Sequence, residues 1–210
     1  AVVFICLKNE KISFKNFFEA LKPFKIKIYL VFHFIPKRKL LKDVESNFLN
    51  QNNRFLLFDP IINLAKTGNW IIDQKTDMEH WNQLIHKSKL STSIYVDARI
   101  HQNAGATIPQ QLAYGMSQAV DYITQIESSS FDEVEILFHL AVGSNYFFEI
   151  AKIQALKTVF SQVLSIYNFR ITFKIIAEPS KRNMTLQDYN NNMLRTTTAL
   201  MAAILGGADF

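Results

Sequence analysis

The stretch SIYVDARIHQNAGATIPQQLAYGMSQAVDYITQIES, from Ser93 to Ser128, carries the clearest structural signals in the chain. Its first part alternates between two kinds of side chain, and this two-residue period predicts a β-strand. One face of the strand is apolar, with Ile94, Val96, Ala98 and Ile100. The other face carries polar and charged groups, with Tyr95, Asp97, Arg99 and His101. The stretch therefore begins with a strand that has one apolar face and one polar, charged face.

A long helix is predicted directly after this strand. Thr107 stands three residues before Gln110, the spacing of a capping box, and Pro109 lies in the first turn, where its missing N–H is harmless. An apolar stripe follows at helical spacing, formed by Leu112, Met116, Ala119, Val120, Ile123 and Ile126. This stripe can lie on the apolar face of the strand, so the two elements form half of a βαβ unit.

The same alternation runs along the whole chain. Strands are predicted at 1–8, 25–34, 54–61, 93–101, 134–142 and 169–176. Helices are predicted at 12–21, 38–51, 75–88, 107–126, 147–166 and 191–205, with starts near Thr107, Tyr146 and Asn190. This order is typical of a parallel sheet or barrel with crossover helices, and from the residues alone a closed barrel and an open doubly wound sheet fit it equally well.

Composition narrows the class of protein. The 210 residues, 49% apolar and 20% charged, fit one globular domain spanning 1–210. The net charge of +5 is spread along the chain except for the cluster Pro36–Lys39, with neither an RNA-type aromatic motif nor a zinc pattern beside it. We therefore expect no nucleic-acid partner.

Cysteine usage and hydropathy suggest a compartment. The single cysteine, Cys6, lies in an apolar run and allows no disulfide framework, which fits a reducing environment and a buried side chain. No run approaches the ~20 apolar residues that span a bilayer. We expect a soluble, cytoplasmic protein with no membrane contact.

Common catalytic motifs are absent from the sequence. It holds no CxxC, HExxH, P-loop or GxSxG pattern, and its glycines form no dinucleotide fingerprint. No metal site is expected. Asp59 and Pro60, at the end of the third predicted strand, are typical of a turn.

Three segments resemble the methylmalonyl-CoA mutase family. They are HQNAGATIPQQLAYGMSQAVDYI (101–123), SNYFFEIAKIQALK (144–157) and TLQDYNNNMLRTTTALMAAILGGADF (185–210). The resemblance implies a parallel (β/α)8 TIM-type barrel, with about six of the eight strands in this chain. It also implies a link to the adenosylcobalamin-dependent isomerisation of methylmalonyl-CoA to succinyl-CoA in propionate metabolism.

The positions that match the family's catalytic polar residues have changed here. Alignment through the three segments places Leu57, Phe58 and Asp59 at a Gln-Asn-Asp run, Arg99 and Ile100 at a Tyr-His pair, and Ile176 and Glu178 at a His-x-Gln run. We regard Leu57, Ile100, Ile176 and Glu178 as degenerate positions and expect no catalytic residue in this chain. Substrate-binding candidates are His33, His101, Gln102 and Asn145, although a strand-end histidine is often a hydrogen-bonded structural residue.

The resemblance also implies a lumen, which in this family is lined by small side chains around the acyl-CoA tail. In this chain, the alternate strand residues that would face the lumen have long side chains, among them Tyr29, Tyr95, Leu137, His139 and Ile176. We therefore expect no ligand along the axis. Charged side chains among these lumen-facing residues must form ion pairs, because an unpaired buried charge costs several kcal/mol. The predicted set is Lys27, Arg99 and Lys174 against Asp97 and Glu135.

These observations favour a small, non-catalytic subunit that supports the catalytic large subunit of a heterodimeric mutase. No Asp-x-His-x-x-Gly motif is present, so we expect no cobalamin-binding domain in this chain and adenosylcobalamin bound only in the holoenzyme. The alternative is an acyl-CoA mutase or CoA-binding barrel that is active in its own right with an altered pocket. An unrelated enzyme on a doubly wound sheet is the third hypothesis.

Overall fold

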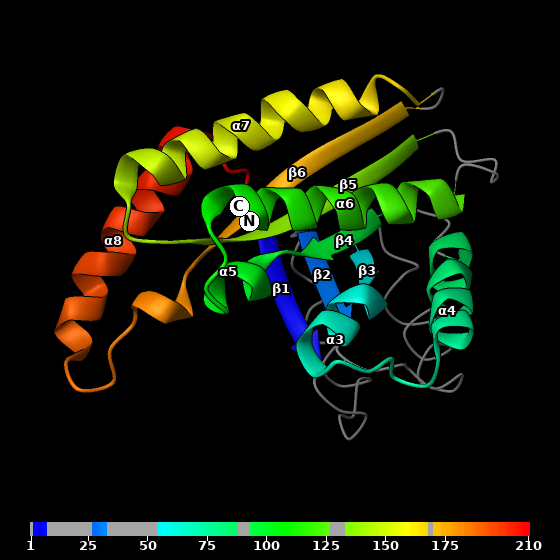
Figure 1. Ribbon diagram of the computed structural model, residues 1–210, viewed down its shortest axis with the longest axis horizontal. Helices are drawn as coiled ribbons and strands as arrows, with labels where there is room; N and C mark the ends of the chain where they lie inside the picture. The colour runs from blue at the N-terminus through cyan, green and yellow to red at the C-terminus, as the bar shows by residue number, and fades with distance from the viewer. Residues whose placement is uncertain (1, 8–26, 33–53, 88–92, 127–132, 168–169) are drawn as a thin grey trace. The chain divides into compact units, whose positions relative to one another are not determined.

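The computed structural model describes residues 2–7, 27–32, 54–87, 93–126, 133–167 and 170–210 (Figure 1). The chain divides into two compact units, Ala1–Ile94 and Tyr95–Phe210. His33 and the helices predicted at 12–21 and 38–51 lie outside the described residues.

The first unit contains a three-stranded parallel sheet. Its strands are β1 (Val2–Leu7), β2 (Lys27–Phe32) and β3 (Arg54–Phe58), in the order β1-β2-β3. Val2 pairs with Lys27, and Ile28 pairs with Arg54. Leu30 and Leu57 are completely buried, as expected for a parallel sheet, whose two faces are normally both covered.

Two helices follow this sheet, α3 (Pro60–Thr67) and α4 (Gln74–Lys87). The carboxylate of Asp59 caps α3 by accepting a hydrogen bond from the N–H of Ile62 at 3.0 Å. The helix ends at Gly68, which has a positive φ of 76°. The strand predicted at 54–61 therefore ends at Phe58, and Asp59 and Pro60, which were predicted to form a turn, begin a helix instead.

The second unit contains β5, β6 and all of β4 except its first two residues, in the sheet order β4-β5-β6. β4 spans Ser93–Asp97, and β5 (Glu133–Val142) and β6 (Arg170–Pro179) pair in parallel along their full length. Its helices are α5 (Arg99–Asn103), α6 (Ile108–Ile126), α7 (Tyr146–Leu164) and α8 (Tyr189–Gly206), with the short 3-10 helix η2 (Lys181–Asn183) before α8. Figure 1 shows these elements from green to red.

One face of this sheet is covered by α6 and α7. The ring of Phe138 on β5 meets that of Phe160 on α7 edge-on at 4.8 Å, and Phe160 meets Phe173 on β6 at 5.4 Å. On α6, a β-carbon at Gly115 would lie 3.1 Å from Cβ of Ala98 and 4.0 Å from the Phe138 ring, so this helix runs close to the sheet. Glu135, Leu137 and His139 have the opposite parity and therefore lie on the other face.

The barrel prediction is wrong. In the part of the chain that the structure describes, the strands form two separate three-stranded sheets, with orders β1-β2-β3 and β4-β5-β6, and no continuous ladder joins them. A barrel needs neighbouring strands hydrogen-bonded all the way round with a fixed stagger. Alternation of strands and helices predicts parallel pairing but carries no information about that closure.

The predicted starts of the three long helices of the second unit are confirmed. α6, α7 and α8 begin at Ile108, Tyr146 and Tyr189. Half of the predicted capping box is present, since the side chain of Gln110 accepts a hydrogen bond from the N–H of Thr107 at 2.9 Å. The Thr107 hydroxyl also donates to the side-chain oxygen of Gln110, at 2.9 Å. Of the predicted stripe, Leu112, Ala119, Ile123 and Ile126 are buried, and Met116 and Val120 are half-buried.

The predicted strand at 93–101 is too long by four residues. β4 ends at Asp97, and Arg99–Asn103 form the short helix α5. The Asp97 carboxylate accepts a hydrogen bond from the N–H of Arg99 at 3.2 Å, an interaction of side chain with backbone that competes with extended pairing. Arg99, Ile100 and His101 are therefore helical residues.

No helix among the described residues is both long and apolar enough to cross a membrane.

Candidate functional site

Polar side chains gather where β4, β5 and β6 end. Asp97 is the last residue of β4, Arg99 begins α5, and His139 lies near the end of β5. Glu178 on β6 pairs in register with Ala141 of β5. The carboxyl edge of a parallel sheet is the usual place for a binding site in α/β proteins. We call Tyr95, Asp97, Arg99, His139 and Glu178 the strand-end cluster.

Arg99 joins two carboxylates in this cluster. Its Nε donates to Oδ1 of Asp97 at 2.7 Å and its NH2 donates to Oδ2 at 2.6 Å. This two-pronged geometry is the strong form of an arginine–carboxylate pair. Its remaining terminal nitrogen, NH1, donates to Oε2 of Glu178. Arg99 therefore links the ends of β4 and β6.

His139 contacts a partner through each of its ring nitrogens. Nδ1 lies 2.7 Å from the hydroxyl of Tyr95, and Nε2 lies 3.4 Å from Oε2 of Glu178. A tyrosine that donates to Nδ1 leaves the proton on Nε2, facing the carboxylate; this tautomer is assigned from the hydrogen-bond network. The two neighbours hold the imidazole in one orientation.

Burial and charge set the protonation states of the cluster. Burial lowers the pKa of His139 and outweighs the hydrogen bond that the imidazole donates to Glu178, so the imidazole is neutral at pH 7. The hydrogen bond with His139, together with the charge of Arg99, lowers the pKa of Glu178 to about 2. Burial pushes the pKa of Asp97 upward, but its bonds to Arg99 prevail and the pKa lies below its ordinary value. At neutral pH two carboxylates therefore share one guanidinium.

A second polar group surrounds Gly143, which follows β5. A β-carbon at this position would lie 2.8 Å from Nε2 of Gln102, 2.9 Å from Oε1 of Glu149 and 3.3 Å from Nδ2 of Asn183. Only glycine leaves room for these three side chains to approach the backbone so closely. The position thus brings α5, α7 and η2 together at the end of β5.

Glu149 forms a buried ion pair with Lys152, one turn along α7. The two side chains are 3% and 0% exposed. Lys152 also donates to the carbonyl of Ala141 at 2.6 Å. Burial lowers the pKa of Lys152 in spite of the nearby carboxylate. The pair joins the first turns of α7 to the end of β5.

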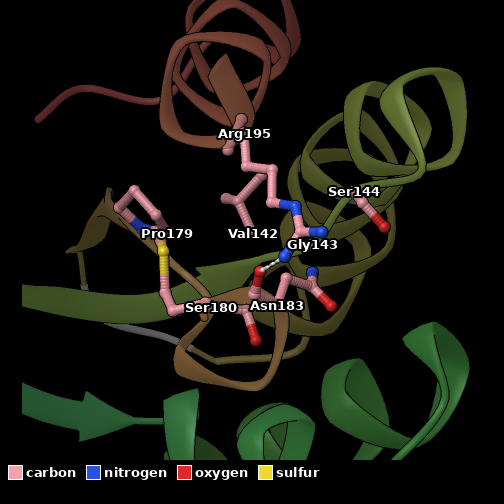
Figure 2. A pocket seen from close by; sticks show the side chains of 9 residues that line it. Val142, Gly143, Ser144, Pro179, Ser180, Asn183 and Arg195 are labelled. Carbon is pink, nitrogen blue, oxygen red and sulfur yellow. Dashed lines mark hydrogen bonds between the residues drawn. The ribbon is translucent and has the colours of Figure 1, made fainter. Parts of the chain in front are cut away.

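Next to Gly143 lies a small hollow (Figure 2). Figure 2 shows Arg195 reaching from α8 toward Asn183, whose carbonyl accepts a hydrogen bond from NH1 of Arg195 at 2.7 Å. The hollow measures about 10 Å³, room for about one water molecule. Its lining is Val142, Gly143, Ser144, Pro179, Ser180, Asn183, Met184, Arg195 and Ala199. It is too small for an acyl group.

The degenerate positions lie in different places. Leu57 is buried in β3 of the first unit, and in the second unit Ile100 lies half-buried on α5. Ile176 is 5% exposed on β6. Glu178 is the one degenerate position that contributes to the strand-end cluster.

The substrate-binding candidates that the structure describes have different surroundings. Gln102 is buried beside Gly143, where its amide oxygen has no hydrogen-bond partner among the residues that the structure describes. His101 is half-buried, with its ring 4.9 Å from that of Tyr114. Asn145 is the exposed N-cap residue of α7 and makes no side-chain capping bond. Their role in substrate binding stays a prediction.

The predicted pairing of charges is confirmed where the structure describes it. Arg99 pairs with Asp97, and Lys174 pairs with Glu135 across β5 and β6. The side chain of Lys27 lies outside the description. Sequence reasoning missed the pair Glu149–Lys152, although an acid and a lysine three residues apart in a largely apolar helix were a usable signal. It also placed His139 in mid-strand without assigning it a partner.

No group of three or more His, Cys, Asp or Glu side chains arranged to hold a metal ion occurs among the described residues. The strand-end cluster is held together by ion pairs and hydrogen bonds. Its chemistry is the binding of carboxylates by Arg99 and His139.

Comparison with known proteins agrees with the resemblance of the three segments. The chain is 34% identical over 116 residues to the methylmalonyl-CoA mutase small subunit of Porphyromonas gingivalis, covering 51% of this chain and 19% of that protein. It is 28% identical over 180 residues to the large subunit of Streptomyces virginiae, covering 82% and 24%. With the large subunit of Propionibacterium freudenreichii subsp. shermanii it shares 29% over 122 residues, covering 54% and 17%.

The chain thus spans about a quarter or less of the length of these relatives. The family model for methylmalonyl-CoA mutase matches residues 53–210, which include all of the second unit. On this match, the chain belongs to the methylmalonyl-CoA mutase family.

Proposed function

We propose that this chain is part of the small, non-catalytic subunit of an adenosylcobalamin-dependent methylmalonyl-CoA mutase, where it supports a catalytic large subunit in a heterodimer. One observation carries the proposal: the charged groups at the strand ends bind one another. Arg99 is shared by Asp97 and Glu178, and His139 lies between Tyr95 and Glu178.

A catalytic group must reach the reacting atoms within hydrogen-bond distance. Arg99 and Glu178 stand at positions matched to catalytic polar residues of the family, and each is held by the other. Ile100 and Ile176, at two further matched positions, can neither donate nor accept a hydrogen bond through their side chains. The cluster is therefore suited to holding the fold together.

Adenosylcobalamin does not fit the imidazoles of the second unit. Both ring nitrogens of His139 face protein partners, and the ring of His101 lies against Tyr114. We therefore assign the binding of this cofactor to other parts of the holoenzyme. No step of the reaction is attributed to the residues described here.

The second candidate is an acyl-CoA mutase that is active in its own right. The match to the large subunit of Streptomyces virginiae favours it, because that match covers 82% of this chain and the small-subunit match covers 51%. The two candidates differ in one measurable property, namely turnover without a partner.

The test is to assay conversion of methylmalonyl-CoA to succinyl-CoA, with added adenosylcobalamin, by the full-length protein that contains this chain. It is assayed alone and again with its large partner. We expect no turnover alone, and turnover together with co-elution when the partner is present. Turnover by this protein alone would establish the second candidate. If the turnover rate and the stability of the large subunit are the same with and without this protein, the first candidate is contradicted.

A further inference from the structure

Two donors from different elements converge on a single oxygen atom of Glu178. NH1 of Arg99, on α5, donates to Oε2, and Nε2 of His139, on β5, lies 3.4 Å from the same atom. The Glu178 side chain is 33% exposed, compared with 16% for Arg99 and 10% for His139. The carboxylate is therefore the outermost of the three groups, and the donors lie beneath it.

Both donors are held in place by groups other than Glu178. Asp97 accepts hydrogen bonds from Nε and NH2 of Arg99, and these two bonds fix the plane of the guanidinium and the direction of NH1. Tyr95 holds Nδ1 of His139 at 2.7 Å. Donors that keep their orientation without the ligand bind it at a smaller entropic cost.

We propose that Arg99 and His139 form a receptor for a small carboxylate, and that Glu178 occupies this receptor from within the chain. Glu178 is then an internal plug, which excludes free carboxylates from the carboxyl edge of the sheet. The inference rests on the proposed function in one respect: the cluster is taken not to be a working active site.

The charges of the cluster select a monoanion. Arg99 is already paired with Asp97, so the receptor without Glu178 has no net charge, and a dianion such as hydrogen phosphate would meet repulsion from Asp97. Glu178→Ala removes a CH2–COO⁻ group, which has the size and charge of acetate. Acetate is therefore the matched probe.

The experiment titrates sodium acetate against sodium chloride at constant ionic strength into the full-length wild type and two variants. Glu178→Ala opens the receptor. Glu133→Ala is the matched control, because it removes a glutamate of an exposed ion pair from the neighbouring strand. Binding is followed by calorimetry and by the thermal unfolding midpoint.

For Glu178→Ala we expect saturable, acetate-specific binding with a Kd on the order of millimolar, at least about tenfold tighter than for the wild type or Glu133→Ala. Adding Arg99→Gln to Glu178→Ala should abolish it, and phosphate should bind more weakly than acetate. Absence of acetate binding in Glu178→Ala, equal binding by the wild type, or binding that survives Arg99→Gln would overturn the proposal.

Folding of the variant is informative as well. If Glu178→Ala folds only with acetate present, the receptor is supported. If it fails to fold in either salt, Glu178→Ser takes its place with the same expectations, and failure of both in acetate would overturn the plug. Turnover by the wild type alone would refute the proposed function and leave the acetate titration unchanged, so the two failures can be told apart.

Discussion

The two ends of the β5–β6 ladder carry the same kinds of charge in opposite surroundings. At the amino ends, Glu133 and Arg170 form a pair 3.4 Å apart, with side chains 51% and 74% exposed. Beside the carboxyl end of β5, Glu149 and Lys152 form a pair with side chains 3% and 0% exposed. Glu135 with Lys174 and Glu178 with Arg99 lie between these extremes.

The difference shows that burial, and not the number of ion pairs, decides how much each pair matters. An exposed pair contributes about 0–1 kcal/mol because water solvates both partners well when they separate. Breaking a buried pair costs more, since one charge then remains away from water without a partner. The carboxyl end of the ladder is therefore the end that is sensitive to substitution.

The largest effect is expected for Lys152→Met, which leaves the Glu149 carboxylate buried without its cation. We expect the free energy of unfolding to fall by about 3–5 kcal/mol. Urea unfolding followed by circular dichroism measures it. The double variant Lys152→Met/Glu149→Leu removes both charges and should recover most of the loss. A single variant as stable as the wild type would contradict the comparison.

Arg99→Met is expected to come second. It removes the donors of Asp97, which is 6% exposed, and of Glu178, which retains contact with water. Hydrogen bonds to charged groups contribute roughly 1.5–3 kcal/mol, so we expect a loss of about 2–3 kcal/mol. The same urea experiment measures it, with Arg170→Met as the control. Equal losses of unfolding free energy in Arg99→Met and Arg170→Met would show that burial does not decide how much an ion pair contributes at the two ends of the ladder.

Acid should remove the contribution of Glu178. Its pKa is lowered from 4.5 to about 2 in the folded protein, so its stabilising effect is present above pH 4.5 and is lost as the pH falls toward 2. The difference in unfolding free energy between the wild type and Glu178→Gln should therefore be greatest at neutral pH. It should shrink as the pH falls from 4.5 toward 2. Thermal midpoints of both proteins at a series of pH values test this. A difference that does not change with pH would be incompatible with the assignment.

The smallest effect is expected for Arg170→Ala. Because both partners of this pair are largely exposed, the free energy of unfolding should change by no more than about 0.5 kcal/mol. Any change should shrink further in 1 M salt, which screens exposed charges. A loss above about 1 kcal/mol that persists in high salt would show that the amino end is not the solvated end.

Part of the candidate site could be predicted because it depends on local chemistry. The alternation at 93–97 placed Tyr95 and Asp97 on one face, and the same parity grouped the cations Lys27, Arg99 and Lys174 with the anions Asp97 and Glu135. The structure assigned the pairs, Arg99 with Asp97 and Lys174 with Glu135. The convergence of Gln102, Glu149 and Asn183 on Gly143 could not be predicted. These residues come from three elements separated by many positions in the chain, and only the packing of α5, α7 and η2 around β5 brings them together.

Sequence pattern was sufficient to predict the strands that the structure describes and the starts of α6, α7 and α8, because side-chain period and capping act over a few neighbouring residues. The helices α3 and α5 were not predicted. Only the fold showed that the strands of the described residues form two three-stranded sheets, since closure depends on stagger between strands that alternation does not encode. It also decided that Arg99 begins a helix and meets Glu178, which lies 79 residues away in sequence. The strength of each ion pair was likewise settled by packing, because packing determines which charges water can reach.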